Sequence, residues 1–310
     1  MCRDKTLKCI SVFLLTVLLA DCAAQNAEKI SASGSEDNAA FAENAVICYL
    51  GPEGTYTEEA AKLFFGADSD LQPQQTVSDS IKQLLEGKCD YAVIPQENTI
   101  GGPVYDYIDE VIVNEEISIV GEVELPLRQA LLVRDGTALD DIETVYSHKQ
   151  GIAQGADWLK NNLSHAEVVE VSSTAEGARI VAGSDTGSCA AIASVGSAEV
   201  YGLTVLAENI QNNDNNKTRF YVISVDAPKE TGAERIVFTA RGEAGDFPEL
   251  IIAIDRQGLT PVFIHDRTEK TILGRYIWLI ECEGGDYDSF TAIKNSVKLE
   301  LKYRGAFSVK

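Results

Sequence analysis

Strand-like and helix-like segments alternate along residues 46–201, and this alternation restricts the fold more than any other feature of the sequence. Short apolar runs such as Val46–Leu50 and Cys189–Ala193 have the length and composition of buried strands. Segments with apolar residues at helical spacing lie between such runs, as in Thr174–Ala182. A chain that alternates in this way is typical of the α/β class with mainly parallel sheets. We therefore predict two successive α/β units.

The elements of these units can be placed from their patterns. Strands are expected at 46–50, 91–94, 117–123, 144–146, 168–171 and 189–193. Helices are expected from an N-cap at Thr57 to Phe64, and at 78–86, 104–113, 150–163, 174–182 and 195–201. In α/β folds, ligands bind past the carboxyl ends of strands, in the crevice between units. The loops to examine are therefore 51–57, 95–102, 147–154, 172–175 and 209–219.

The order of elements changes after the stretch Asp226-Ala227-Pro228. Strands are expected at 235–240, 260–265, 275–282 and 303–309, and helices at 247–257 and 287–300. This β-α-β-β-α-β order is the ferredoxin-like arrangement. We expect it to form a separate domain of about 75 residues, which is within the usual size range.

The N-terminal residues have the order of features found in an export signal. Basic residues at 3, 5 and 8 precede an apolar run at 10–20, which is short for a membrane span. We expect residues 1–24 to be a signal peptide, or a lipoprotein signal in which Cys22 is lipidated, and 25–45 to be a disordered polar linker. The protein would then be periplasmic or a membrane-anchored lipoprotein. The alternative is a misassigned start in front of a cytoplasmic protein.

Charge and motifs exclude several classes of function. The formal net charge of -22 argues against a nucleic-acid binder, which needs a basic face. The chain has no P-loop, no GxGxxG opening a helix and no GxSxG elbow. The three histidines, His148, His165 and His265, are far apart, and no CxxC pair occurs. We therefore expect neither a metal site nor a redox motif.

Four cysteines remain with either kind of signal: Cys48, Cys89, Cys189 and Cys282. Each lies in or beside an apolar, strand-like run, so buried free thiols are the default expectation. Export would be compatible with a disulfide, but the sequence assigns no pairing.

The candidate loops hold neutral hydrogen-bonding groups and one cation, Arg219. The neutral groups are Thr55, Asn98, Thr99, Ser147, Gln150, Gln154, Ser172, Ser173, Thr174 and Thr218. Taken singly, each has an ordinary explanation, such as a helix N-cap or a turn. Together, on one crevice, they fit a small polyanion bound by Arg219 and helix N-termini. Such a set suits hydrogen-bond donation and not metal, redox or phosphoryl chemistry.

Six collinear segments between Val46 and Ser224 resemble the prephenate dehydratase family. They read GPEGTYTEEAA, PQENTIGGPV, LPLRQALL, VYSHKQGIAQGADWL, VSSTAEGARIVA and AAIASVGSAEVYGLTVLAENIQNNDNNKTRF, starting at Gly51, Pro95, Leu125, Val145, Val171 and Ala190. The resemblance implies that residues 46–226 form a catalytic domain of two subdomains of the periplasmic-binding-protein type. The active site would lie in the cleft between them.

The resemblance also implies which residues act. Thr218, in the Thr-Arg-Phe motif, would be catalytic and face the leaving hydroxyl of prephenate, while Arg219 would hold a carboxylate. Further substrate-binding residues are expected at Asn98, Thr99, Ser147, Gln154, Ser173, Thr174, Thr55 and Phe220. His148 matches the family's Ser-His pair, and we expect its role to be structural. The reaction yields phenylpyruvate, carbon dioxide and water, and aromatisation drives it, so no cofactor is expected.

The C-terminal domain, residues 232–310, resembles an ACT domain, which in this family binds phenylalanine between subunits. The effector residues would be Phe247, Asp266 and Arg267. Only Arg267 remains of the family's Glu-Ser-Arg-Pro motif, and Asp246 adds a carboxylate. We therefore expect the ACT fold and a homodimer or homotetramer, but not normal phenylalanine inhibition.

The most direct functional prediction is an exported prephenate dehydratase of L-phenylalanine biosynthesis. An arogenate dehydratase of the same family is the first alternative. A non-catalytic small-anion binding protein on the same fold is the second, and the intact Thr218-Arg219-Phe220 motif argues against it.

Overall fold

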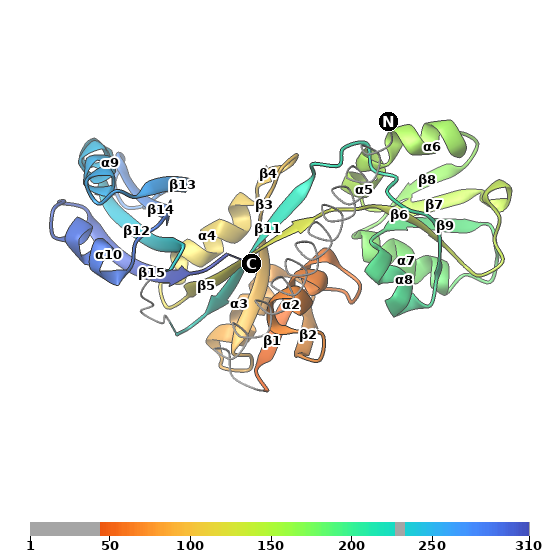
Figure 1. The fold of residues 1–310 in the computed structure, drawn as a ribbon, viewed down its shortest axis with the longest axis horizontal. Helices are drawn as coiled ribbons and strands as arrows, with labels where there is room; N and C mark the ends of the chain where they lie inside the picture. Colours follow the sequence, from red (N-terminus) through yellow and green to blue (C-terminus); the bar gives the residue numbers. More distant parts are fainter. Residues whose placement is uncertain (1–43, 227–232, 310) are drawn as a thin grey trace, which may run out of the picture. The chain divides into compact units, whose positions relative to one another are not determined.

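The computed structural model describes residues 44–226 and 233–309, all but the first of which belong to one compact unit, Ala45–Lys310. The predicted signal segment and almost all of the predicted linker lie outside the described residues. The described part contains two α/β subdomains and a C-terminal α+β domain (Figure 1). No helix in the described part is long and apolar enough to cross a bilayer.

The first subdomain is built on a sheet with strand order β2-β1-β3-β11-β5. Its strands are β1 (Val46–Leu50), β2 (Asp70–Gln74), β3 (Tyr91–Asn98), β4 (Gly102–Pro103, paired with β3), β5 (Ser118–Pro126) and β11 (Lys217–Ser224). Its helices are α2 (Tyr56–Phe65), α3 (Val77–Leu85) and α4 (Tyr105–Val113). The core between α3, α4 and the sheet contains Ile81, Leu84, Ile94, Ile108 and Ile223, all of them buried.

The second subdomain is built on a sheet with strand order β10-β6-β9-β7-β8. Its strands are β6 (Ala130–Val133), β7 (Thr144–Ser147), β8 (Glu167–Glu170), β9 (Cys189–Ala193) and β10 (Thr204–Ala207). Its helices are η2 (Leu139–Asp141), α5 (Lys149–Gln154), α6 (Ala156–Asn162), α7 (Thr174–Ala182) and α8 (Val195–Tyr201). Aliphatic side chains of β6 and β9 fill the core on both faces of this sheet.

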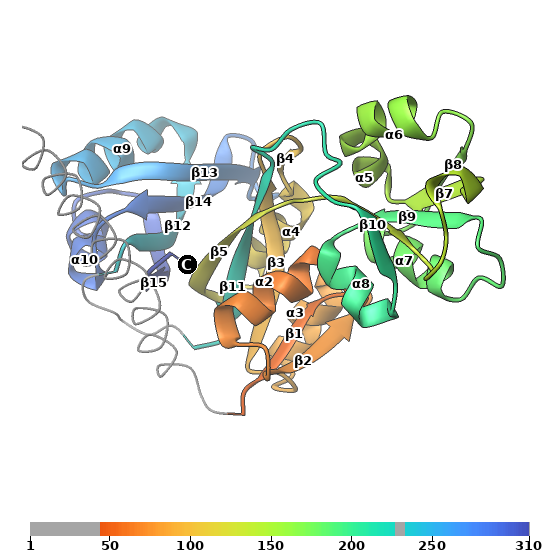
Figure 2. The same cartoon turned by 45° about the vertical axis from the view of Figure 1, so that its right-hand side comes forward.

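Two segments, called the crossing segments, connect the subdomains. Residues 127–129 lead from β5 to β6, and residues 208–216 return the chain from β10 to β11 (Figure 2). Because β11 returns antiparallel to both β3 and β5, and β6 is antiparallel to β9 and β10, both sheets are mixed. The α/β prediction is confirmed, but the expected mainly parallel pairing is wrong.

The C-terminal domain has the predicted β-α-β-β-α-β order. Its elements are β12 (Arg235–Glu243), η3 (Ala244–Asp246), α9 (Phe247–Arg256), β13 (Thr260–Thr268), β14 (Arg275–Glu283), α10 (Tyr287–Lys294) and β15 (Glu300–Phe307). The strand order β13-β14-β12-β15, with every pair antiparallel, confirms the ferredoxin-like prediction.

The C-terminal sheet packs its helix-free face against the first subdomain. On β14, Trp278 and Ile280 face α9 and α10, while Ile277 and Leu279 join the core of the first subdomain. The two backbones lie close together at Gly305, where φ is +138° and a Cβ atom would lie 1.9 Å from the carbonyl oxygen of Ile119. Only glycine allows the backbones of β15 and β5 to approach this closely.

Several predicted boundaries differ from the structure. Helix α2 is capped by Thr55, whose Oγ1 accepts a hydrogen bond from the Glu58 N–H, and not by Thr57. Strand β3 continues through Pro95 to Asn98, because a register shift in its pairing with β11 accommodates the proline. The helix expected at 287–300 ends at Lys294.

The helix expected at 150–163 is two short helices separated at Gly155. Asn212, in the returning segment, bonds at this break: its N–H donates to the Gln154 carbonyl at 2.6 Å, and its Oδ1 accepts from the Asp157 N–H at 3.2 Å. Contacts with residues distant in sequence therefore replace the helical bonds. Strands β2, β4, β6 and β10 were not predicted.

Two of the cysteines are paired. Cys48 and Cys89 form a disulfide with Cα atoms 6.1 Å apart, whereas Cys189 and Cys282 are free thiols. The expectation of free thiols is therefore wrong for Cys48 and Cys89. They meet because β1 and β3 are adjacent parallel strands, with Cys48 opposite Ala92, three residues after Cys89.

Candidate active site

A cavity of about 490 Å³ lies where β3 and β11 of the first subdomain meet the helix starts of both subdomains. Among the predicted site residues, those that line it are Thr55, Asn98, Gln154, Ser173, Thr174, Thr218 and Phe220. Residues from sequence positions 50 to 220 thus converge on one cavity, as the crevice argument predicted.

Thr218 is held at the cavity by Asn98. The Thr218 Oγ1 accepts a hydrogen bond from Asn98 Nδ2 at 3.0 Å, and the same Nδ2 donates to Asn216 Oδ1 at 2.8 Å. Asn98 is fixed in turn, because its Oδ1 accepts from the backbone N–H groups of Ile100 and Gly101. Since Asn98 supplies the hydrogen in the bond to Thr218, the proton of the Thr218 hydroxyl remains free to donate to a ligand.

The N-termini of two helices supply positive electrostatic potential at the cavity. Thr55 caps α2, and Ser173 caps α7 by accepting from the Glu176 N–H at 2.9 Å; both caps line the cavity. Thr174 is the first residue of α7. The described residues that line the cavity include no Lys, Arg, Asp or Glu. An anion in the cavity would therefore be bound by helix dipoles, backbone N–H groups and neutral side chains.

His148 also lines the cavity, and its role in the structure is that of a cap. Its side chain begins α5, where Nδ1 accepts a hydrogen bond from the Gln150 N–H at 3.3 Å. Burial, followed by the charge of Lys149, lowers the pKa of His148, and Glu170 opposes this effect. The ring is therefore neutral at neutral pH and presents Nε2–H as its free donor.

The amide side chains of Gln129 and Gln154 form the cavity wall near the crossing segments. Gln129 donates from Nε2 to Gln154 Oε1 at 2.8 Å, and the backbone N–H of Gln129 donates to Gln211 Oε1 at 2.9 Å. Gln129 is buried, and its Oε1 has no hydrogen-bond partner among the described residues. Gln129 was not among the predicted site residues, although it lies in the LPLRQALL segment.

Three predicted substrate-binding residues do not line the cavity: Ser147, Thr99 and Arg219. Ser147 is fully buried and donates from Oγ to the Ile192 carbonyl at 2.6 Å, so its hydroxyl joins β7 to β9. Thr99 donates from Oγ1 to the Lys217 carbonyl at 3.1 Å and lies beside a separate small hollow. Both hydroxyls donate to backbone carbonyls, and that they bind substrate stays a prediction.

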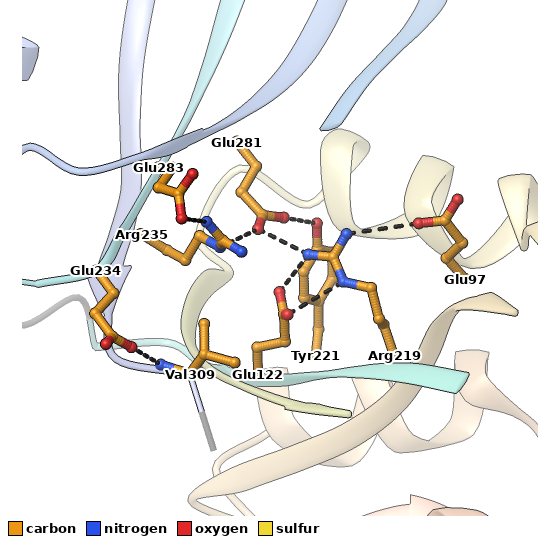
Figure 3. Close-up of polar contacts among 9 residues, drawn as sticks. All are labelled: Glu97, Glu122, Arg219, Tyr221, Glu234, Arg235, Glu281, Glu283 and Val309. Atoms are coloured by element: carbon orange, nitrogen blue, oxygen red, sulfur yellow. Dashed lines mark hydrogen bonds and ion pairs between the residues drawn. The ribbon is translucent and has the colours of Figure 1, made fainter. Parts of the chain in front are cut away.

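Arg219 also points away from the cavity. Successive side chains of a strand face opposite sides, so Thr218 and Phe220 line the cavity while Arg219 lies on the other face of β11. There its guanidinium donates to Glu122 and Glu281, with 2.8 Å between Nη2 and Glu281 Oε1, and lies 3.5 Å from Glu97 (Figure 3). Arg219 therefore does not line the cavity in this structure, and that it holds a substrate carboxylate stays a prediction.

A family model described as Prephenate dehydratase matches residues 47–228, which is more than half of the chain. The chain belongs to the prephenate dehydratase family. The matched residues contain both subdomains, both crossing segments and all the residues that line the cavity.

Relatives of the prephenate dehydratase family cover most of the chain. It is 36% identical over 245 residues to the bifunctional chorismate mutase/prephenate dehydratase of Neisseria gonorrhoeae, with 78% of this chain and 67% of the relative covered. It is 34% identical over 272 residues to the prephenate dehydratase of Amycolatopsis methanolica, with 84% and 88% covered. The chain therefore spans about two thirds of the bifunctional relative and most of the other.

A solved structure from the prephenate dehydratase family extends the likeness to the C-terminal domain. It is the prephenate dehydratase from Arthrobacter aurescens in complex with L-Phe, with a TM-score of 0.74 and 28% identity. The match covers 85% of this chain and 90% of that chain. No group of three or more His, Cys, Asp or Glu side chains within 44–226 and 233–309 is placed to hold a metal ion.

Besides Gln129, two aromatic residues that line the cavity were not predicted from the sequence. Tyr56 and Tyr107 contribute aromatic walls, and the Tyr56 hydroxyl donates to the Arg128 carbonyl at 2.7 Å in the first crossing segment. Tyr56 stands beside the Thr55 cap, so its position at a helix start was the available signal. Tyr107 lies within α4, and its sequence neighbours carry no signal of a site.

Proposed function

We propose that this chain is a prephenate dehydratase that converts prephenate to phenylpyruvate in L-phenylalanine biosynthesis. The observation that carries the proposal is the Thr218 hydroxyl, which Asn98 holds at a cavity with helix N-termini and, among the described residues that line it, no Lys, Arg, Asp or Glu. Family membership supports the same reaction.

The reaction can be carried out with the hydroxyl and N–H groups that line the cavity. As the bond between the ring and its carboxylate breaks, its electron pair enters the ring and the C–O bond to the ring hydroxyl breaks. Carbon dioxide leaves, and the departing hydroxide takes up one proton to become water. Aromatisation drives the reaction, so the protein has to orient the substrate and stabilise the departing oxygen. The Thr218 hydroxyl is a positioned donor for that oxygen.

The two substrate carboxylates need partners in a protein of formal net charge -22. The N-termini of α2 and α7, capped by Thr55 and Ser173, provide N–H donors and a local positive potential. Gln154 and Thr174 add neutral donors at the same cavity. These residues, and not Arg219, are proposed to hold the substrate.

The direct test is turnover of prephenate by the purified chain without residues 1–24. We expect phenylpyruvate to form without added metal or cofactor. Arogenate, tested in parallel, would yield phenylalanine if the alternative substrate is correct. Calorimetric binding of prephenate without turnover of either compound would support the small-anion binding protein and contradict the dehydratase.

We also propose that L-phenylalanine acts weakly on this chain. A hollow of about 300 Å³ in the C-terminal domain is lined by Ala244, Phe247, Asp266, Tyr276 and Trp278. Its aromatic walls suit a phenyl ring, but the Asp266 carboxylate would repel the carboxylate of an amino acid. Arg267 does not line the hollow, because its guanidinium is paired with Asp109 of α4 at 3.7 Å.

Replacement of Asp266 by asparagine is expected to strengthen inhibition by L-phenylalanine about fivefold, because removal of a like charge is worth on the order of 1 kcal/mol. The measurement is an inhibition curve of the dehydratase assay for both proteins. Phe247→Ala, which removes the aromatic wall, is the matched control and should weaken inhibition. Equal inhibition of parent and Asp266→Asn would contradict the charge argument.

A homodimer through the C-terminal domain is a further proposal. Strand β13 is an edge strand. Val262 and Ile264 of this strand and Ile252 of α9 expose apolar surface, and 43% of Ile264 is exposed. Ile264→Asp is expected to produce monomers in sedimentation experiments, because it places a charge on this surface. Leu63→Asp on α2, at another exposed apolar position, should leave the assembly unchanged.

We further propose that the protein is exported. The disulfide between Cys48 and Cys89 supports an oxidising compartment, because such bonds rarely persist in the cytosol. Cell fractionation should place the chain in the periplasm or envelope, with Cys48 and Cys89 resistant to alkylation until a reductant is added. Recovery in the cytoplasm with both thiols reactive would contradict export.

A further inference from the structure

The face of β11 opposite the cavity carries a buried cluster of charged groups that the proposed reaction does not use. It consists of Arg219 and Tyr221 of β11, Glu122 of β5, Glu281 of β14 and Arg235 of β12, and is called the Arg219 cluster below (Figure 3). The side chains of Glu122 and Glu281 are fully buried, and that of Arg219 is 16% exposed. Two carboxylates and two guanidiniums thus balance in charge.

Glu281 makes the contacts between domains in the Arg219 cluster. Its Oε1 accepts from Arg219 Nη2 at 2.8 Å and lies 3.3 Å from Arg235 Nε. Its Oε2 accepts from the Tyr221 hydroxyl at 2.8 Å. One carboxylate of the C-terminal domain therefore binds two side chains of the strand that carries Thr218.

The pairing of β11 with β3 is irregular at this point. The register shifts between Arg219 and Phe220, where Gln96 of β3 is the extra residue, so this ladder is interrupted next to Thr218. The pairing of β11 with β5 is regular from Lys217 to Val222. A bulge re-aims the side chains beside it, and the guanidinium of Arg219, held by Glu122 and Glu281, fixes the face of β11 that points away from the cavity.

We propose that Glu281 is a positioning residue for the Thr218 hydroxyl and acts across the domain boundary through Arg219. This inference rests on the proposed dehydratase function. The C-terminal domain would then contribute to the geometry of the active site even when no effector is bound.

The titration of Glu281 offers a readout that a purely structural role would not give. Burial raises the pKa of Glu281 to about 7, and Glu122 adds to the increase, whereas Arg219 and the Tyr221 hydroxyl oppose it. Arg235 is the remaining charged group facing it. Below about pH 7 the carboxyl gains a proton, loses its ion pairs and holds Arg219 less firmly. We therefore expect kcat of the parent to fall on the acid side of pH 7.

The test compares Glu281→Gln with Glu283→Gln, which lies two residues further on the same strand and pairs with Arg235 but not with Arg219. At pH 8, Glu281→Gln is expected to lower kcat about tenfold with KM within twofold of the parent. Its kcat should no longer change between pH 6 and 8. Glu283→Gln should keep the kcat and pH profile of the parent.

A measurement independent of turnover separates this inference from the proposed function. Hydrogen exchange of the peptide covering 217–224 should be faster in Glu281→Gln than in the parent and unchanged in Glu283→Gln. If the parent fails to convert prephenate, the proposed function fails and the exchange data still decide whether Glu281 orders β11. Parental kcat, pH profile and exchange rates in Glu281→Gln would overturn the inference.

Tyr221→Phe covers the case in which Glu281→Gln does not fold. The substitution removes only the hydroxyl that donates to Glu281 and keeps the packing of the ring. Because this hydrogen bond lowers the pKa of Glu281, its loss should move the acid limb of kcat to higher pH. An acid limb at the position seen in the parent would count against the proposal.

Discussion

Replacement of Thr218 by alanine is expected to lower kcat for phenylpyruvate formation by ~10²–10³, the usual effect of losing one donor to a charge that develops in the transition state. KM should change little, because the hydroxyl acts on the departing oxygen and the carboxylates are bound elsewhere. The fold should tolerate the change, because Asn98 Nδ2 keeps Asn216 Oδ1 and the Lys217 carbonyl as acceptors. The measurement is steady-state kinetics beside thermal unfolding of the same samples.

Thr218→Ser is the matched control. It keeps the hydroxyl and the bond from Asn98 and removes only a methyl group, so most of the activity should remain. Parental turnover in Thr218→Ala would remove the hydroxyl from the mechanism. A large fall in melting temperature in the same variant would instead assign Thr218 a structural role.

Elements with strong local signals were predicted from the sequence with correct bounds. Thr174–Ala182 has apolar residues at helical spacing, and Cys189–Ala193 is a compact apolar run, so both were placed at their observed residues. Strand β2 has the sequence DLQPQ and only exposed or half-buried residues, so it shows no apolar alternation. Its pairing with β1 creates the strand, and such pairing between distant segments leaves no mark in a short window of sequence.

The sequence predicted which polar residues line the candidate site better than it predicted how their side chains are arranged. Hydroxyl and amide groups at helix starts, such as Thr55 and Ser173, do line the cavity, because a capping residue sits at the end of the helix that faces it. Arg219 was placed beside Thr218 because the two are adjacent in sequence. The alternation of side chains along a strand places them on opposite faces, and the alternating apolar residues of this strand already contained that information.

Replacement of Arg219 by alanine therefore separates the two interpretations of this residue. If Arg219 held a substrate carboxylate, KM would rise and stability would be unaffected. In the structure, its loss leaves Glu122 and Glu281 buried without this cation. We expect the free energy of unfolding to fall by about 3–5 kcal/mol, the usual cost of removing one partner of a buried ion pair. Urea unfolding of parent and variant measures the difference.

The loss of unfolding free energy in Arg219→Ala, called the deficit, should also depend on pH. The direction of this dependence follows from the titration of Glu281. Its pKa in the folded parent is already raised to about 7, and removal of Arg219 raises it further. A group whose pKa is higher in the folded state than in the unfolded state loses stability as pH rises. The deficit should therefore grow as pH rises through about 7 and shrink towards pH 5, where Glu281 is protonated in both proteins.

Lys217→Ala provides the control on the same strand, because Lys217 pairs with the exposed Glu124 at 3.1 Å and its loss should cost less than about 1 kcal/mol. If Arg219→Ala unfolded in urea like Lys217→Ala and had only a raised KM, the guanidinium would have to leave Glu281 and reach the substrate during the reaction. That result would contradict a structural role for the ion pair between Arg219 of β11 and Glu281 of the C-terminal domain. A deficit several times that of Lys217→Ala, largest at alkaline pH, is the outcome that the buried carboxylates require.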